Sequence, residues 1–264
     1  MLRSALLNVM IQAAQKAGRT LRRDFGEIEK LQVSVKGPGN YASAADSRAE
    51  ETLFRELSKA RPGYGFLGEE GGAREGSDKT HTWIVDPLDG TTNFLHGIPH
   101  FAISIALERD GVVIAGVIYN PVTDDLYLAE RGKGSFHNDK RIRVAARREL
   151  NHALVACPLP HVGRNDPATG RELAAMQTKV AGLRRYGAAA LDLAYVAAGR
   201  FDIYWERNIK PWDMAAGIAL VREAGGFVTD IDGGDAMFEK GHIVAGNDVM
   251  HREALAVLSR AAED

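Results

Sequence analysis

The stretch WIVDPLDGTTNF, Trp83 to Phe94, decides how the rest of the chain is interpreted. Its apolar start predicts a short strand, Trp83 to Val85, which would deliver Asp86 to its carboxyl end. Pro87 restricts the backbone after that strand. Asp89 follows at once, so two carboxylates are expected side by side. A surface turn with one capping aspartate is the alternative interpretation of so short a string.

The residues after Asp89 predict an anion site. A helix that begins at Gly90 would leave the backbone N–H groups of Gly90, Thr91 and Thr92 without helical partners, and such groups bind anions. Asp86 and Asp89 would repel a phosphate there, unless a hard cation lies between them. Oxygen ligands favour Mg²⁺, with Mn²⁺ as a substitute, over zinc. The stretch therefore predicts metal-assisted phosphoryl chemistry.

Composition excludes several other classes of protein. The 264 residues are enough for one large domain or two coupled layers, and a formal charge of −2 argues against bulk attraction to nucleic acid or anionic lipid. Cys157 is the single cysteine, which excludes an intrachain disulfide and a cysteine-based zinc site. No apolar run approaches the roughly 18 residues of a membrane span. The amino-terminal stretch also lacks the pattern of a secretory signal. A cytoplasmic protein without membrane contact is expected.

The hydrophobic periodicity predicts a change of architecture near residue 145. Helical spacing runs from Leu2 to Phe25, and Phe101 to Leu107 with Val112 to Tyr119 predicts a hairpin. The stretch RGKGSFHNDK, Arg131 to Lys140, is expected to be turns. Beyond residue 150, strands and helices alternate. We expect an α/β protein with an α+β half at 1–145 and an α/β half at 146–264, the site lying between them.

Four stretches together closely resemble the inositol monophosphatase family. WIVDPLDGTTNFLHGIPHFAISIAL begins at Trp83, and KPWDMAAGIALVREAGG covers Lys210 to Gly226. LGEEGG at Leu67 to Gly72 and GAAALDLAYVAAGRFD at Gly187 to Asp202 match the intervening motifs. The likeness spans nearly the whole chain in the family's order. It implies the layered αβαβα sandwich that this family shares with fructose-1,6-bisphosphatase.

The resemblance also implies a set of metal ligands. Two Mg²⁺ ions are expected, with a third held weakly near Glu69 and the loop Lys36 to Asn40. The ligands of the first ion would be Glu69, Asp86 and the backbone carbonyl of Leu88. Those of the second would be Asp86, Asp89 and Asp213.

The implied reaction is hydrolysis of inositol 1-phosphate to myo-inositol and phosphate, with inhibition by Li⁺. The amides of Gly90, Thr91 and Thr92 would hold the phosphate beside Asp89. An attacking water would be activated by the metal and by the Thr91 hydroxyl paired with Asp46, so that Asp46, Thr91 and Glu69 are assigned to catalysis. Positions matching Ala189 and Glu206 contact the hydroxyls of the polyol. A homodimer is implied as well.

Alternatives remain for the substrate and for the role. Related proteins act on fructose 1,6-bisphosphate, histidinol phosphate or adenosine 3′,5′-bisphosphate. Some bacterial members are partners of RNA polymerase in antitermination, and the pair Arg184 and Arg185 could make such a contact, although a solvated face is the simpler interpretation.

Several candidate site residues also have an ordinary structural interpretation. Asp213 alone would be an acid that complements a helix dipole. Glu206 could be a surface charge, and Glu70 is expected to be solvated or to lie behind the metal ligands. His96 and His100 are expected to pack or to form hydrogen bonds rather than to bind metal, because Gly97 and Pro99 interrupt any helix there.

Overall fold

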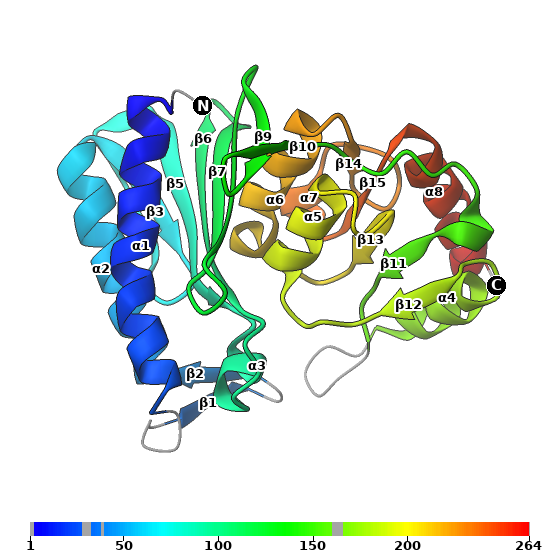
Figure 1. The fold of residues 1–264 in the computed structure, drawn as a ribbon, viewed down its shortest axis with the longest axis horizontal. Helices are drawn as coiled ribbons and strands as arrows, with labels where there is room; N and C mark the ends of the chain where they lie inside the picture. The colour runs from blue at the N-terminus through cyan, green and yellow to red at the C-terminus, as the bar shows by residue number, and fades with distance from the viewer. Residues whose placement is uncertain (1–2, 28–32, 38–39, 160–165, 264) are drawn as a thin grey trace.

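The computed structural model of the chain describes residues 3–27, 33–37, 40–159 and 166–263. Helices and sheets alternate in layers, as Figure 1 shows. Two helices cover the outer face of an eight-stranded sheet, two lie between it and a five-stranded sheet, and two cover the far face of the latter. The predicted α/β class and αβαβα layering are confirmed.

The first layer consists of helices α1 (Ala5–Phe25) and α2 (Ala44–Ala60), which pack on each other and on the larger sheet. Ser4 caps α1 by accepting a hydrogen bond from the Leu7 backbone N–H at 3.1 Å. The predicted apolar stripe of α1 is buried except for Leu6, which is half-buried; its buried members are Leu7, Met10, Ile11, Ala14, Ala17 and Leu21. A two-stranded sheet, β1 (Val33–Gly37) and β2 (Asn40–Ser43), precedes α2. The strand predicted from Ile28 to Val35 falls partly outside the described residues.

The larger sheet has the order β10-β9-β8-β7-β6-β5-β3-β4. Its neighbouring strands are antiparallel except for β3 and β5, which are parallel. The predicted hairpin is β6 and β7. The strands are β3 (Tyr64–Gly68), β4 (Gly72–Arg74), β5 (Asp78–Asp89), β6 (Ala102–Arg109), β7 (Val112–Asn120), β8 (Asp125–Glu130), β9 (Gly134–His137) and β10 (Lys140–Ile142).

The expectation of turns throughout Arg131 to Lys140 is wrong, because β9 lies within that stretch. Gly132 has a positive φ of 78°, while Asn138 and Asp139 have φ of 44° and 65°. Two successive residues with positive φ form the tight turn that matches the twist of a hairpin. The turn residues therefore flank a short strand instead of replacing it.

The strand predicted at Trp83 to Val85 is longer than expected, since β5 continues to Asp89. Its pairing with β6 shifts register between Asp86 and Asp89, so the strand bulges there. Pro87, which has no N–H to donate, lies in this bulge. Asp86 is therefore not at the carboxyl end of the strand as predicted. The helix that follows, α3 (Thr91–Leu95), is a single short turn.

The smaller sheet has the order β12-β11-β13-β15-β14. Helices α5 and α6 lie between the two sheets, and α4 and α8 cover the outer face. The strands are β11 (Leu154–Ala156), β12 (Gly182–Arg184), β13 (Ile203–Glu206), β14 (Phe227–Thr229) and β15 (Ile243–Gly246). The helices are α4 (Pro167–Gln177), α5 (Ala189–Ala197), α6 (Pro211–Glu223), α7 (Met237–Lys240) and α8 (Asp248–Glu263), with a 3₁₀ turn at Leu150–His152.

Helix α6 belongs to the second half of the chain but packs on β6 and β7 of the larger sheet. Its buried residues join those of α5 and of both sheets in one central hydrophobic cluster. The division of the chain at residue 145 stays a prediction.

Helix α6 approaches the sheet closely at Gly116. A Cβ on Gly116 would lie 2.5 Å from the backbone oxygen of Ala216 and 2.9 Å from its Cα. Gly116→Ala is therefore expected to destabilise the protein by about 2–3 kcal/mol, because backbone atoms of α6 must move. Gly170→Ala, in α4, is the matched control, since its Cβ would meet nothing within 4 Å. Urea unfolding would measure both changes. Equal midpoints for the two variants would contradict this packing.

Candidate metal centre

Three aspartates from two distant parts of the chain meet between the sheets. Asp86 and Asp89 come from the bulged end of β5, and Asp213 comes from the first turn of α6. They are 2%, 8% and 8% exposed, respectively. One carboxylate oxygen of each lies within 4.8 Å of the others. The structure therefore brings together the three residues predicted for the second metal.

Backbone N–H groups orient each of these carboxylates. The Leu88 N–H donates to Asp86 Oδ1 at 2.9 Å, a hydrogen bond within the bulge itself. The N–H of Ala189 donates to Asp89 Oδ1 at 3.2 Å, and that of Ala190 to Asp89 Oδ2 at 2.7 Å. Both donors belong to the start of α5, where N–H groups have no helical acceptor.

Asp213 is the third residue of α6. Its Oδ2 accepts the backbone N–H of Lys210, the residue that precedes the helix, at 2.7 Å. This contact is the helix-start role that Asp213 would have as an ordinary structural acid. The same side chain nevertheless lies in the trio with Asp86 and Asp89. The two interpretations of Asp213 are therefore compatible.

Burial and the repulsion between neighbouring carboxylates disfavour the ionised forms of Asp86 and Asp89. The pKa of Asp86 is raised well above its usual range, first by burial and then by the charges of Glu69, Asp89 and Asp213. Burial also raises the pKa of Asp89, and Asp213 adds to the shift. A divalent cation between the oxygens would remove this cost. The donor set is oxygen only, which fits a hard ion such as Mg²⁺ or Mn²⁺.

A second acidic cluster adjoins the first. Asp46 on α2 is 1% exposed, and Glu69 and Glu70 lie in the partly exposed turn between β3 and β4. Carboxylate oxygens of the three lie within 4.8 Å of one another. The charges of Glu69 and Asp46 both raise the pKa of Asp86, so the two clusters are close. Glu70, expected to be solvated or to lie behind the ligands, is half-buried within the second cluster.

The predicted anion site follows directly on β5. Gly90 precedes α3 with a positive φ of 92°, and a Cβ there would lie 3.0 Å from the His100 carbonyl oxygen. Only glycine fits this position without strain. Thr92 is exposed, and the Thr91 hydroxyl donates to the Leu88 carbonyl oxygen at 3.0 Å. The predicted pairing of Thr91 with Asp46 stays a prediction.

The residues predicted for the polyol end lie on the Asp89 side of the centre. Ala189 is 8% exposed, and its N–H is the one that holds Asp89. Glu206 ends β13, half-buried, and its Oε2 accepts the hydroxyl of Tyr204 at 2.6 Å. Its charge contributes to the raised pKa of Asp89, which shows that the two carboxylates are near each other.

Asp192 is an acid near the centre that the sequence interpretation missed. It is 3% exposed, and its pKa is raised well above the usual range by burial and by the charges of Glu206 and Asp89. Asp192 follows Ala189 by three residues in α5, so both lie on one face of that helix. This spacing was the one signal that could have identified it.

Of the two histidines in the segment after α3, His100 packs as expected. His96 is exposed, and the ring of His100 lies edge-to-face on that of Tyr186, with 5.1 Å between the ring centres. Burial lowers the pKa of His100. Within the described part of the chain, the two clusters that could hold a metal contain carboxylates and no histidine.

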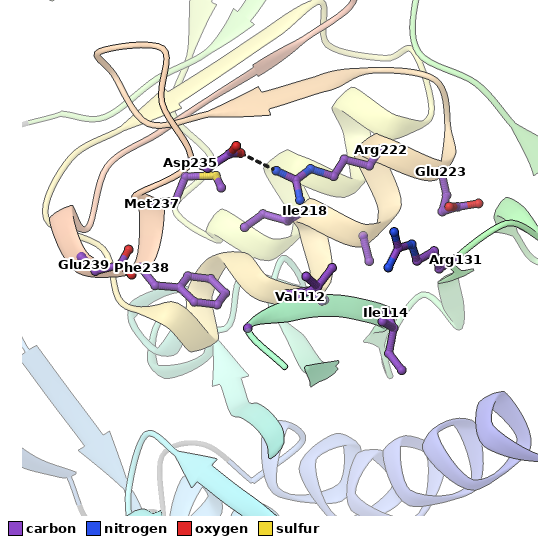
Figure 2. A pocket seen from close by; sticks show the side chains of 13 residues that line it. Val112, Ile114, Arg131, Ile218, Arg222, Glu223, Asp235, Met237, Phe238 and Glu239 are labelled. Carbon is purple, nitrogen blue, oxygen red and sulfur yellow. Dashed lines mark hydrogen bonds and ion pairs between the residues drawn. The ribbon is translucent and has the colours of Figure 1, made fainter. Parts of the chain in front are cut away.

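A cavity of about 620 Å³ lies elsewhere, between β7 and the end of α6 (Figure 2). Val112, Ile218 and Phe238 are among the residues that line it. Arg222 and Asp235 also line it and form an ion pair at 3.1 Å. At 1.5 Å per residue, Arg222 is about 13.5 Å along α6 from Asp213. None of the predicted site residues lines this cavity, and it is not the metal centre.

Among the residues that the structure describes, no helix is both long enough and apolar enough to span a lipid bilayer.

Comparison with known proteins agrees with this geometry. The model of the inositol monophosphatase family matches residues 2–263. An inositol-1-monophosphatase of Mesorhizobium japonicum is 61% identical over 261 residues, which cover 98% of each chain. The Nus factor SuhB of Pseudomonas aeruginosa is 44% identical, over 92% of this chain and 91% of that protein. The crystal structure of the extragenic suppressor protein suhB from Bartonella henselae has a TM-score of 0.93 at 57% identity, over 97% of this chain and 98% of that one. The chain belongs to the inositol monophosphatase family.

Proposed function

We propose that the protein hydrolyses a small phosphate monoester, foremost inositol 1-phosphate, to the free alcohol and phosphate with Mg²⁺. The observation that carries the proposal is the meeting of Asp86, Asp89 and Asp213, with oxygen donors only, beside a second acidic cluster. The raised pKa of Asp86 and of Asp89 supports it. The relative from Mesorhizobium japonicum, named an inositol-1-monophosphatase, supports the choice of substrate.

Two cations would be held by residues that already converge. Glu69, Asp86 and the carbonyl of Leu88 would hold one, and Asp86, Asp89 and Asp213 the other, with a third ion beside Glu69 at lower affinity. The Leu88 oxygen accepts the Thr91 hydroxyl but has a second lone pair for an ion. When bound, such ions neutralise phosphate oxygens, lower the pKa of water and stabilise a leaving alkoxide. Mn²⁺ has the same preference for oxygen ligands and could substitute.

The chain's own groups would position the substrate. The N–H groups of Gly90, Thr91 and Thr92 would donate to the phosphate oxygens next to Asp89. Thr91 Oγ1 would orient the attacking water. For this step the Thr91 hydroxyl would turn from the Leu88 carbonyl to Asp46, whose buried carboxylate would accept its proton as the hydroxyl takes one from the water. No covalent intermediate is needed, so positioning and charge stabilisation supply most of the rate.

The alcohol end of the substrate would lie against Glu206 and Ala189. Glu206 would accept hydrogen bonds from two neighbouring hydroxyls while Tyr204 holds it in place. Because the N–H of Ala189 already donates to Asp89, the methyl group of Ala189 would contact the alcohol.

The Glu206→Gln variant tests the polyol contact. We expect KM for inositol 1-phosphate to rise about tenfold with a smaller change in kcat, because a hydrogen bond to a charged acceptor contributes about 1.5 kcal/mol or more. Hydrolysis of phenyl phosphate, which has no polyol, should be unaffected. Glu239→Gln, at an exposed position, is the matched control. Equal losses on both substrates would remove Glu206 from the polyol site.

A substrate panel tests the proposed reaction. Values of kcat/KM would be compared for inositol 1-phosphate, fructose 1,6-bisphosphate, histidinol phosphate and adenosine 3′,5′-bisphosphate. The proposal requires inositol 1-phosphate to rank first. A higher value for another ester would reassign the substrate while leaving the metal chemistry in place.

Three further properties are proposed, the first two of them from the family resemblance. Li⁺ should inhibit the reaction, and the chain should form a homodimer. A cytoplasmic location is proposed because Cys157 is the single cysteine, so the chain has no intrachain disulfide; its thiol is free and buried.

A second candidate role is contact with the transcription machinery, as expected for some members of the family. Arg184 and Arg185 are exposed beside Tyr186, whose side chain is also exposed, and relatives named Nus factor SuhB share this family. A pull-down of RNA polymerase from lysate with the double Arg184→Ala, Arg185→Ala variant tests this role. The exposed pair Arg252 and Arg260 on α8, also replaced by alanine, is the control. Recovery of no polymerase with the unmodified protein would end this hypothesis.

A further inference from the structure

Glu50 lies beneath the turn that carries Glu69 and Glu70. It belongs to α2 and is 3% exposed. Its Oε2 accepts the backbone N–H of Glu70 at 2.7 Å, and its Oε1 accepts that of Gly71 at 2.6 Å. Both carboxylate oxygens are therefore bound to the backbone of one turn. Hydrogen bonds from N–H groups to a carboxylate are short and about twice as strong as neutral ones.

Two glycines of the turn make room for this carboxylate. A Cβ on Gly68 would lie 2.5 Å from Glu50 Oε2, and a Cβ on Gly71 would lie 2.8 Å from Oε1. A long side chain could normally swing aside, but here both oxygens are held by the turn. Gly68 and Gly71 do not have positive φ. They are therefore needed for space rather than for backbone conformation.

Helix α2 also supplies Asp46 to the second acidic cluster. Asp46 and Glu50 are one helical turn apart and are both buried, at 1% and 3% exposure. One face of α2 therefore places Asp46 beside Glu69 and Glu70. The same face places Glu50 where it accepts a hydrogen bond from the backbone of their turn. The relative position of Asp46 and Glu69 is set by this link.

We propose that Glu50 is a positioning residue of the metal centre. It fixes the turn so that the Glu69 carboxylate meets Asp46 and the neighbouring Asp86 before any ion binds. This inference rests on the proposed metal centre and adds a residue that touches neither ion nor substrate. Groups that orient metal ligands in this way typically change metal affinity by 10- to 100-fold when they are replaced.

Glu50→Gln tests the proposal with little change of volume. The glutamine side chain has one carbonyl oxygen and one NH₂ group, so it can accept only one of the two N–H groups. In the metal-free protein, amide hydrogen exchange at Glu70 or Gly71 should become at least about tenfold faster. Calorimetry should show Mg²⁺ affinity weakened about 10- to 100-fold. At saturating Mg²⁺, kcat should fall much less, because Asp46 and Glu69 remain in place.

Glu51→Gln is the matched control. Glu51 is the next residue of α2, it is exposed, and the change removes the same charge. Exchange and Mg²⁺ affinity should stay as in the unmodified protein. If Glu50→Gln gives the same exchange rates and Mg²⁺ affinity as Glu51→Gln, Glu50 has no positioning role. If Glu50→Gln does not fold, Gly71→Ala disturbs the same contact from the turn and should weaken Mg²⁺ binding, and unchanged binding would overturn the proposal.

Failure of the underlying metal centre would be recognised separately. An unmodified protein that binds no Mg²⁺ in calorimetry would overturn both the centre and the role of Glu50 in it. Unchanged binding in the Glu50→Gln variant of a protein that does bind Mg²⁺ would overturn only the role of Glu50.

Discussion

Replacing Asp89 with asparagine is expected to lower kcat about a thousandfold, equivalent to roughly 4 kcal/mol of transition-state stabilisation. Asp89 is one of three carboxylates whose oxygens lie within 4.8 Å of one another. Removing its charge would weaken the binding of the cation that this trio is proposed to hold. Phosphate release from inositol 1-phosphate at saturating Mg²⁺ would measure the effect.

The fold of the Asp89→Asn variant should survive. Asparagine can still accept one of the two N–H groups, from Ala189 or Ala190, that orient Asp89. The repulsion that raises the pKa of Asp89 disappears at the same time. Asp110→Asn is the matched control, since Asp110 is exposed and asparagine tolerates its positive φ of 52°. An Asp89→Asn enzyme as active as this control would remove Asp89 from the centre.

Asp86→Asn should stabilise the metal-free protein while abolishing most of its activity. Four acidic neighbours and burial make the ionised Asp86 side chain unfavourable. Asparagine removes that charge, and its Oδ1 can still accept the Leu88 N–H. In EDTA, the melting temperature should rise by about 2–4 °C for each kcal/mol that the substitution adds to the free energy of unfolding. Mg²⁺ should raise the melting temperature of the unmodified protein and leave the variant almost unchanged.

The pH dependence of this stabilisation has a definite sign. A carboxyl whose pKa is higher in the folded than in the unfolded state stabilises the fold while it is protonated. That contribution is lost as the pH rises from the ordinary value of 3.8 through the raised pKa of the folded state. The melting-temperature advantage of Asp86→Asn in EDTA should therefore grow from pH 4 towards neutrality. An advantage that is constant over this range would contradict the electrostatic account.

The parts of the fold that depend on local periodicity could be predicted from the sequence. The apolar stripe of α1 and the hairpin β6–β7 follow from spacing over a few residues. β9 could not be predicted, because glycine and asparagine in its flanks looked like uninterrupted turns. The extension of β5 through Pro87 was missed as well, because a bulge tolerates a proline that a regular strand does not.

The candidate site shows the same division between local and distant information. Asp86 and Asp89 could be paired from their own motif, whereas Asp213 joined them only through the family resemblance. Glu50 gave no motif-level signal, whereas Asp192 lies within the matched stretch Gly187 to Asp202 but was assigned no role there. The role inferred for Glu50 depends on backbone N–H groups of a distant turn, and the burial of Asp192 depends on how α5 packs between two sheets. Periodicity carries no information about such contacts.

We expect the two acidic clusters to form a Mg²⁺ centre that hydrolyses inositol 1-phosphate. The most direct test is the rate of phosphate release from inositol 1-phosphate with Mg²⁺, after removal of the metal with EDTA, and after Mg²⁺ is restored. Activity should be lost with EDTA and fully recovered with Mg²⁺. Equal rates with and without EDTA would contradict this expectation.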